Sequence, residues 1–357
     1  MRVKLIIASD STDSDNKVPV DNLLQKLHKN WEHYQLAVTA EDNKNSTAAK
    51  KPLKVIVCVS GGSDSVALLH LLQRQRTLLN LEPHLLHFNH QLRPEADHEQ
   101  DFVQALADQY EIPFHHKTAK HLKSGQSALQ ESARDWRIEE SCRLLKHLGG
   151  GRIATGHQAD DQLETLLLKL LRGTHISNLQ GMQWTNEDFI RPLLNCRKTE
   201  LQEYLKSNQL TWLEDTSNQS TAYLRNRVRL ELIPLLEELT RQGLHSRIND
   251  LSEQSRLLRE FLDSDYKSWQ QNHKNSAANS QDVLPVKILQ QANDLLQQEI
   301  LHNFITARTG QALSFRKLQN IFIQLRTGSN LWEMHLSQKW KICKSREELC
   351  LQQNQQP

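Results

Sequence analysis

The sequence predicts an α/β fold with a parallel central sheet, followed by a helical region and a small α+β domain. Between residues 53 and 172, short apolar runs alternate with longer segments of helical periodicity. Strands separated by helices of this length form βαβ units, whose sheet is parallel and covered on both faces. After Gly173 the alternation stops and helical spacing dominates.

The expected elements follow one another regularly. The patterns predict strands at 53–59, 84–89, 113–117 and 152–155, and helices at 64–79, about 96–110, about 127–147 and 159–172. Before them, residues 1–19 are rich in Ser and Asp and look loose. Residues 21–36 have the spacing of an amphipathic helix that could lie against the sheet.

The later part of the chain has a different composition. Residues 198–206 resemble a helix, 212–220 are rich in turn formers, and 222–269 are helical with an expected break near Pro234. The C-terminal segment predicts helices at 286–307 and 314–325 and strands near 331–336, 340–343 and 349–351. We therefore expect an N-terminal extension with a helix (1–50), the α/β domain (51–220), a helical region (221–270), a linker (271–284) and a small C-terminal domain (285–357).

Composition narrows the class of protein. The 357 residues are 38% hydrophobic and 24% charged, with a net charge of +2, so any basic surface for nucleic acid must be local. Five scattered cysteines without C-x-x-C spacing argue against a disulfide framework, a zinc site or an iron–sulfur cluster. We find no apolar stretch of ~18 residues and no targeting segment, so we expect a cytoplasmic protein without a membrane span.

The segment Ser60–Ser65 reads SGGSDS and lies between an expected strand and an expected helix. Unpaired backbone N–H groups and the helix dipole make such a turn an anion site. Gly61 and Gly62 permit close approach of a phosphate chain, Ser60, Ser63 and Ser65 add hydroxyl donors, and Asp64 is placed to hold Mg²⁺. The lysine of the G-x-x-x-x-G-K-[ST] motif is absent, which excludes an ordinary P-loop NTPase.

A second acidic segment follows the strand expected at 152–155. Asp160, Asp161 and Glu164 lie at the start of a helix, and Glu164 is one turn after Asp160 and Asp161. Helix capping explains part of this pattern. A triphosphate site, however, needs magnesium ligands, and a cationic amine substrate needs carboxylates that bind it and accept its proton.

Two groups of arginines are candidates for phosphate contacts. Arg134 and Arg137 are three residues apart on one face of an expected helix, with Glu131 one turn earlier. Arg225, Arg227 and Arg229 follow one another without an intervening acid. In both cases an ordinary solvated basic surface is the alternative.

Several segments in order resemble known families. Ser60–Ser65 resembles the SGGxDS signature of the N-type ATP pyrophosphatase, or PP-loop, superfamily. His87–Arg93 resembles the HxNHxLR pattern of tRNA(Ile)-lysidine synthetases, and Gly156–Thr165 their GHxxDDxxET motif. The arginine pair Arg134 and Arg137, the W-x-x-D-x-(S/T)-N pattern from Trp212 and the R-N-x-x-R pattern from Arg225 extend the resemblance over roughly residues 50–235.

This resemblance implies a PP-loop ATP pyrophosphatase domain and a reaction. ATP, L-lysine and tRNA(Ile) with a CAU anticodon would give lysidine at the wobble cytidine, AMP and pyrophosphate, by way of an adenylated tRNA. Asp64 and Asp161 would hold Mg²⁺, Asp161 and Glu164 the lysine, and Arg134 would offset charge in the intermediate. The expected tRNA contacts are Arg137, Arg225, Arg227, Arg229 and the C-terminal domain.

Two other readings stay open at this point. A PP-loop tRNA thiolase or amidotransferase-type enzyme would need paired cysteines, a cluster or a glutamine-hydrolysing module, none of which we find. A non-catalytic tRNA-binding protein could keep the nucleotide fold, although the acidic residues argue against it. A homodimer is compatible with the sequence, which does not decide the oligomeric state.

Overall fold

The computed structural model describes residues 4–6, 20–38, 51–89, 96–119, 129–174, 176–214, 224–241, 243–273, 283–310 and 313–354. They form two compact units. Unit 1 comprises Met1–Thr165 and Met182–His245, and unit 2 comprises Leu166–Gly181 and Ser246–Pro357. The division falls within helices α5 (Ala159–Arg172) and α9 (Leu244–Asn272).

Unit 1 is built on a six-stranded sheet with the strand order β4-β3-β2-β5-β7-β6. The strands are β2 (Leu53–Cys58), β3 (Leu81–Asn89), β4 (Phe114–Thr118), β5 (Arg152–Ala154), β6 (Thr185–Asn186) and β7 (Phe189–Ile190). All neighbours are parallel except β6 and β7. These parallel pairs confirm the predicted α/β class, and the middle of β2 is buried on both faces, as a central parallel strand requires.

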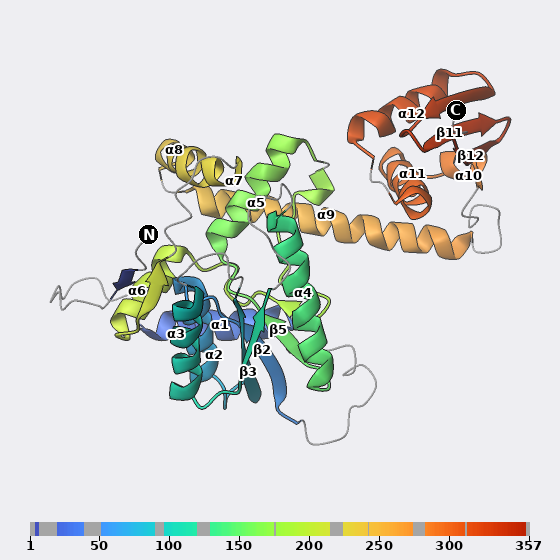
Figure 1. The fold of residues 1–357 in the computed structure, drawn as a ribbon. Coiled ribbons are helices and arrows are strands. Elements are labelled where there is room, and N and C mark those ends of the chain that lie inside the picture. Colours follow the sequence, from blue (N-terminus) through green and yellow to red (C-terminus); the bar gives the residue numbers. More distant parts are fainter. Residues whose placement is uncertain are drawn as a thin grey trace. The chain divides into compact units, whose positions relative to one another are not determined.

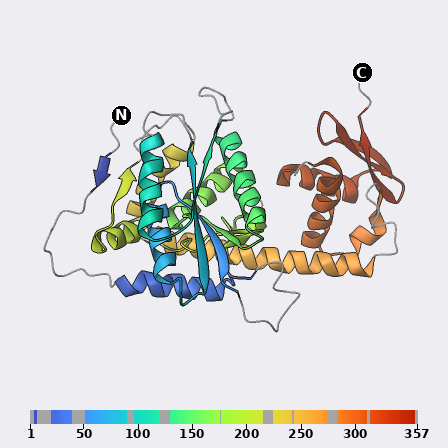
Figure 2. The ribbon, with the colours of Figure 1, turned by 60° about the horizontal axis from the view of Figure 1, so that its bottom comes forward.

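Helices cover both faces of this sheet, as Figures 1 and 2 show. Helices α2 (Ser63–Arg74) and α3 (Ala96–Gln109) lie on one side and α4 (Leu129–His147) lies on the other. The α2 side holds the larger core, to which Val57 of β2 belongs, and the α4 side holds a smaller core that includes Ile56 and Leu144. Successive strand residues therefore point to opposite cores.

Helix α1 (Val20–His33) is also part of unit 1. Its apolar face packs into the larger core, and its Asn30 side chain donates a hydrogen bond of 3.0 Å to the Pro192 carbonyl. Tyr34, just after the helix, stacks on Trp184 with ring centroids 3.8 Å apart. The amphipathic helix expected at 21–36 is confirmed.

The order of the strands places the site. From β2 the chain proceeds through β3 to β4 on one side, and β5 then returns to the other side of β2. Ligands of open α/β sheets bind at the carboxyl ends of the strands, where this reversal opens a crevice. The two segments that end β2 and β5 are Ser60–Ser65 and Gly156–Thr165.

Some elements of unit 1 differ from expectation. The helix expected at 64–79 ends at Arg74, and a turn leads to Asn80, which has a positive φ of 49°. Residues 1–19 were expected to be loose but contain β1 (Lys4–Ile6), and residues 212–220 were expected to be turn-rich but contain β8 (Trp212–Glu214). The two strands pair antiparallel. These strands are too short to show a clear period of two.

The expected break near Pro234 is wrong. Helix α7 (Leu224–Arg227), a π-helical segment (Val228–Leu232) and α8 (Ile233–Leu239) form a continuous helical path through Pro234. Proline is tolerated because the π-helical segment just before it replaces the regular α-helical hydrogen-bond pattern where the proline lacks an N–H. The path ends at Thr240 and Arg241, which has a φ of 50°. Helix α6 (Lys198–Ser207) confirms the helix expected at 198–206.

Unit 2 contains the later part of α5, a short 3₁₀ turn (Ile176–Asn178) and most of α9. Ser252 and Ser255 of α9 donate hydrogen bonds to the carbonyls of Gln180 and Ile176, at 2.7 and 2.6 Å. Its antiparallel sheet has the order β10-β11-β12-β9. The strands are β9 (Val283–Pro285), β10 (Leu331–His335), β11 (Trp340–Ser345) and β12 (Glu348–Gln353).

Helices α10 (Val286–Gln290), α11 (Asp294–Thr309) and α12 (Phe315–Thr327) complete the small α+β fold. The single helix expected at 286–307 is two helices, because the Asn293 side chain caps α11 by accepting from the Leu296 N–H at 2.9 Å. Sixteen buried residues form one core, which includes Trp269 of α9 and Leu336 just after β10. None of the described helices is both long and apolar enough to cross a membrane.

Candidate active site

The turn between β2 and α2 has the shape that a phosphate site requires. Gly61 has a φ of +92°, a left-handed conformation that favours glycine. Its carbonyl accepts a hydrogen bond of 2.9 Å from the Leu213 N–H, so β8 fixes the turn from outside. Gly62 begins α2 without a side-chain cap, which leaves first-turn N–H groups directed at an incoming anion.

The serines of this turn hold its shape. The Ser65 hydroxyl accepts a hydrogen bond from the Ser60 N–H at 3.2 Å and donates one to the Gly62 carbonyl at 3.0 Å. The Ser63 hydroxyl donates to Asp64 Oδ1 at 3.0 Å. Both side chains are nearly buried, so their first role in this structure is to order the turn around Asp64.

The second motif lies directly against the turn. A Cβ atom on Gly156 would be 3.1 Å from the carbonyl carbon of Asp64 and 3.1 Å from the nitrogen of Ser65. The backbones are this close because β2 and β5 are parallel neighbours, with Val57 opposite Ala154. The phosphate turn and the acidic segment therefore share one edge of the sheet.

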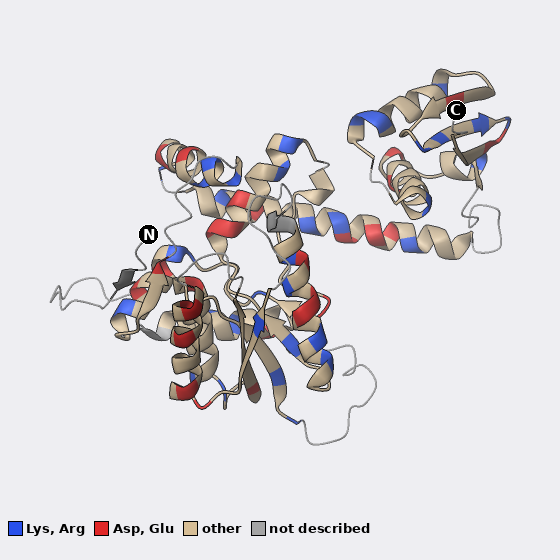
Figure 3. Cartoon of the chain, in the orientation of Figure 1, with Lys and Arg blue, Asp and Glu red and all other residues tan. Residues whose placement is uncertain are grey.

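Asp160, Asp161 and Glu164 lie in the first half of α5, where the ribbon of Figure 3 is coloured for acidic residues, and Asp64 lies in the first turn of α2. Burial raises the pKa of Asp64, and the nearby Asp161 and Asp160 raise it further. Burial also raises the pKa of Asp161, against the opposing effects of the Gln158 N–H, which donates to it at 3.1 Å, and of two arginines. Asp64 and Asp161 thus offer oxygen ligands close enough to interact, which fits Mg²⁺ bound between protein and phosphates.

Asp160 has a different environment. Burial raises its pKa, but His245, 3.0 Å away, and the Lys198 N–H, which donates at 3.2 Å, outweigh that effect and lower it. Asp160 therefore ties α5 to α6 and to His245. Its carboxylate is already engaged by protein groups and is less available to a ligand than Asp64.

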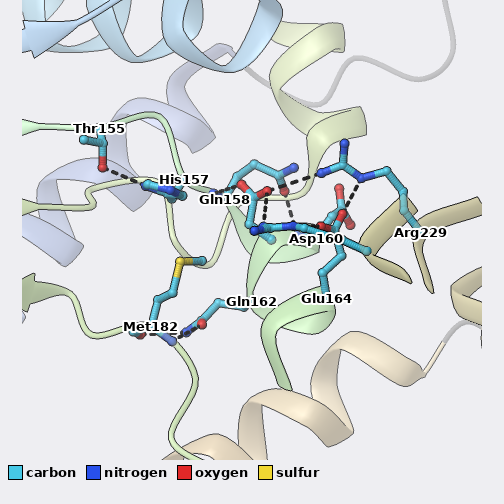
Figure 4. Close-up of polar contacts among 10 residues, drawn as sticks. Thr155, His157, Gln158, Asp160, Gln162, Glu164, Met182 and Arg229 are labelled. Atoms are coloured by element: carbon cyan, nitrogen blue, oxygen red, sulfur yellow. Dashed lines mark hydrogen bonds and ion pairs between the residues drawn. The ribbon is translucent and has the colours of Figure 1, made fainter. Parts of the chain in front are cut away.

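Glu164 is fully buried and held by two arginines of the later helical path, of which Figure 4 labels Arg229. Arg225 Nε donates to Glu164 Oε2 at 2.8 Å, and Arg229 Nε donates to the other carboxylate oxygen. The same guanidiniums lie 3.7 and 3.5 Å from Asp161 Oδ1. The structure thus joins the residues expected to bind lysine to two residues expected to bind tRNA.

The remaining predicted arginines are placed differently. Arg227 is 60% exposed and pairs with Glu231 at 3.1 Å, one turn along the helical path. Arg134 and Arg137 are exposed residues of the first half of α4. Neither forms an ion pair with a carboxylate in the part of the chain that is described.

Sequence reasoning missed His157 and Arg191 as members of the site. His157 Nδ1 is 2.8 Å from the Thr155 hydroxyl. Burial lowers the His157 pKa to about 4, and Arg191, Arg225, Arg134 and Arg137 lower it further, so the ring is neutral at pH 7. Arg191 follows β7, the strand next to β5. No spacing in the sequence indicated that Arg191 lies near His157, because their proximity depends on strand order.

The segment from His87 is only partly described. His87 is buried, and its Nδ1 donates to the Val59 carbonyl at 2.9 Å. The Asn89 amide donates to Asp97 of α3 at 3.1 Å. Residues 90–93, residues 215–218 and the Glu131 side chain lie outside the described parts.

The chain is similar over much of its length to several curated proteins. The chain is 31% identical over 313 residues to a tRNA(Ile)-lysidine synthase of Enterococcus faecalis, covering 84% of this chain and 66% of that protein. It is 35% identical to one of Chlorobaculum tepidum (58% and 64%) and 38% identical to one of Porphyromonas gingivalis (52% and 41%). The chain therefore spans less than two thirds of the length of these curated relatives.

The fold has a counterpart among solved structures. A U34-tRNA thiolase from Methanococcus maripaludis with its [4Fe-4S] cluster superposes with a TM-score of 0.50 at 16% identity, over 65% of this chain and 78% of that one. This likeness concerns the fold alone. A family model described as the PP-loop domain matches residues 33–236, more than half of the chain and all of the edge described above. The chain belongs to the PP-loop domain family.

Proposed function

We propose that the protein is an ATP-dependent ligase that attaches L-lysine to C2 of the wobble cytidine, position 34, of tRNA(Ile) with a CAU anticodon. The product is lysidine, and AMP and pyrophosphate are released. The observation that carries the proposal is the contact of Gly156 with Asp64 and Ser65, which brings a phosphate turn and amine-binding carboxylates to one edge. The names of the relatives agree with it.

The chemistry requires two steps. The C2 oxygen of cytosine is a poor leaving group, so it first attacks the α-phosphorus of ATP, and pyrophosphate departs. The ε-amine of lysine then attacks C2, and AMP leaves with the former C2 oxygen. The wobble base must leave the anticodon stack for either step.

The residues at this edge of the sheet would have different roles in the two steps. The backbone of Ser60–Ser65 would bind the triphosphate, with its hydroxyls and the first turn of α2. Mg²⁺, when bound to Asp64 and Asp161, would neutralise phosphate charge. Arg134 would offset the negative charge of the adenylated intermediate.

The lysine site is proposed at Asp161 and Glu164. The ammonium group must lose a proton before it attacks, and the raised pKa of Asp161 suits it to accept that proton. Because Arg225 and Arg229 pair with the same carboxylates, the incoming ammonium must exchange with or join these guanidiniums. A tRNA phosphate that attracts Arg225 would then favour lysine binding as well.

The proposal also places the enzyme in the cytoplasm, with Arg137, Arg225, Arg227, Arg229 and the C-terminal domain (285–357) as tRNA contacts. A thiolase is the second PP-loop candidate. Burial raises the pKa of the Cys58 thiol, at the end of β2, to about 11, which disfavours the thiolate that sulfur transfer needs.

The test uses the full chain with ATP, labelled lysine and a tRNA(Ile) transcript. We expect pyrophosphate release over many turnovers to require both lysine and tRNA, and labelled lysidine to appear in the nucleoside digest. Asp64→Asn should lower turnover by at least about 100-fold with tRNA affinity unchanged, whereas the matched variant Asp101→Asn, exposed on α3, should behave as wild type. Pyrophosphate release that continues over many turnovers without lysine would refute the proposal.

A further inference from the structure

Arg191 directly follows β7, at the carboxyl edge of the sheet. β7 is the neighbour of β5, and β5 is the neighbour of β2, which leads into the phosphate turn. β7 is parallel to β5, with Ala154 opposite Ile190, and the Thr155 N–H donates to the Ile190 carbonyl at 3.0 Å. Ile190 packs into the core on the α2 side and Phe189 against the core on the α4 side. The alternation of a strand therefore directs Arg191 to the α4 side, beside Thr155.

Helix α4 brings two more arginines to the same place. It connects the parallel strands β4 and β5, so it runs against them and its first turns lie over their carboxyl ends. Arg137 is fixed there, because Ser141 Oγ donates to its carbonyl at 2.7 Å and is 3.9 Å from the Cys58 sulfur, the last residue of β2. Arg134 stands almost one turn nearer the start of the helix.

These three guanidiniums lack anionic partners within the described residues. Arg191 Nη1 donates to the Gln183 carbonyl at 2.6 Å, but its buried Nε has no hydrogen-bond partner in the described part of the chain. Burial and the nearby Arg134 lower the pKa of Arg191. Like charges held close together repel one another, so an anion that binds among them gains from all three.

We propose that Arg191 binds substrate: together with Arg134 and Arg137 it forms a three-arginine site for one phosphate group, carried by either ATP or the tRNA backbone. A planar guanidinium binds two phosphate oxygens at once, and three of them surround a tetrahedral group. His157, whose pKa burial and the same arginines lower to about 4, stays uncharged at pH 7 and adds no positive charge to the site. The identity of the two substrates rests on the proposed function.

The test measures binding by the full chain and does not require turnover. Arg191→Ala and Arg191→Gln, the latter keeping a donor for the Gln183 carbonyl, are compared with Lys146→Ala, which removes one exposed cation from the far end of α4. The probes are a non-hydrolysable ATP analogue and a tRNA(Ile) transcript at several salt concentrations.

We expect both Arg191 variants to lose about tenfold or more in affinity for one probe, and Lys146→Ala to lose nothing. Loss for the analogue assigns the site to ATP, and loss for tRNA with a salt slope reduced by about one assigns it to RNA. Affinities within about twofold of wild type for both probes overturn the proposal; Arg191→Gln alone decides this if Arg191→Ala does not fold.

A failure of the proposed function would give a different result from a failure of the three-arginine site. In that case the wild-type chain would show no lysine-dependent release of pyrophosphate, whatever Arg191 contributes to binding of the analogue or of RNA. Conversely, normal lysidine formation with unchanged probe affinities in both Arg191 variants would remove only the three-arginine site.

Discussion

Arg225 Nε donates a hydrogen bond of 2.8 Å to Glu164 Oε2, and this contact links the start of α5 to the helical path some sixty residues later. Glu164 has no exposed surface, whereas Arg225 is half exposed. A buried carboxylate without partners would be strongly unfavourable, and Arg225 and Arg229 supply the hydrogen bonds that Glu164 needs. The conformation of the helical path and the environment of Glu164 in the proposed lysine site therefore depend on each other.

Removing one of the two partners should destabilise unit 1. We expect Arg229→Ala to lower the free energy of unfolding by about 1–3 kcal/mol, because one oxygen of the buried Glu164 loses its charged donor. Arg227→Ala is the matched control, since its pair with Glu231 is exposed, and should change the value by no more than about 0.5 kcal/mol. Equal effects in denaturant titrations would show that Glu164 does not depend on Arg229.

Gly156→Ala tests the contact between the two motifs. The new Cβ would stand 3.1 Å from backbone atoms of Asp64 and Ser65, so the phosphate turn must shift by a few tenths of an ångström. We expect ATP affinity to fall by roughly tenfold, or about 1.4 kcal/mol, in a binding titration. Gly149→Ala is the control: it strains a φ of +84° but meets no neighbour within 4 Å, so it should lower stability and spare ATP binding.

The buried His70 should make stability depend on pH. Its Nδ1 is 2.8 Å from the Tyr204 hydroxyl, and burial, with a smaller effect of Arg74, lowers its pKa from 6.5 to about 4. Because the unfolded chain binds the proton more readily, the stabilisation is complete above about pH 6.5 and is lost as the pH falls toward 4. We expect a decrease of up to about 1.4 kcal/mol per pH unit in the free energy of unfolding.

His70→Gln should flatten that dependence when unfolding is measured at pH 7 and pH 5. The remaining slope would come from other histidines, including His157, whose pKa burial also lowers to about 4. An identical pH dependence in wild type and variant would mean that His70 is not protonated on unfolding in this range.

Arg227 has a more exposed side chain than Arg225 and Arg229 and is therefore the most accessible of the three to RNA. Its guanidinium is 60% exposed and shares only a surface pair with Glu231. We expect Arg227→Ala to weaken tRNA binding about three- to tenfold and to reduce the slope of log K against log salt by about one, with ATP affinity unchanged. A slope equal to that of wild type would remove Arg227 from the tRNA contacts.

The central fold could be predicted because its signals are local. The β-branched run that forms β2, the glycine turn and the apolar spacing of α2 each specify their own structure, and the segment from Gly156 does the same after β5. Short strands carry too few residues for such a signal. β1 and β8 exist only as partners of one another.

Contacts made by strand order and by distant helices could not be predicted. Arg191 reaches the site because β7 joins the sheet beside β5, which no spacing in the sequence encodes. Arg225 and Arg229 looked like free phosphate contacts because no acid stands between them, yet their partner Glu164 comes from another helix. Local reasoning also placed a break at Pro234, where the preceding π-helical segment lets the helical path continue.

The hydrogen bond from the Leu213 N–H to the Gly61 carbonyl bears on how the protein matures during translation. The phosphate turn is among the first parts of unit 1 to leave the ribosome, whereas the strand that braces it is among the last. A nascent chain can form β2 and α2 early, but its nucleotide cradle stays unbraced until β8 has emerged. Competence to bind ATP should thus arise late in synthesis, in one step with closure of the domain.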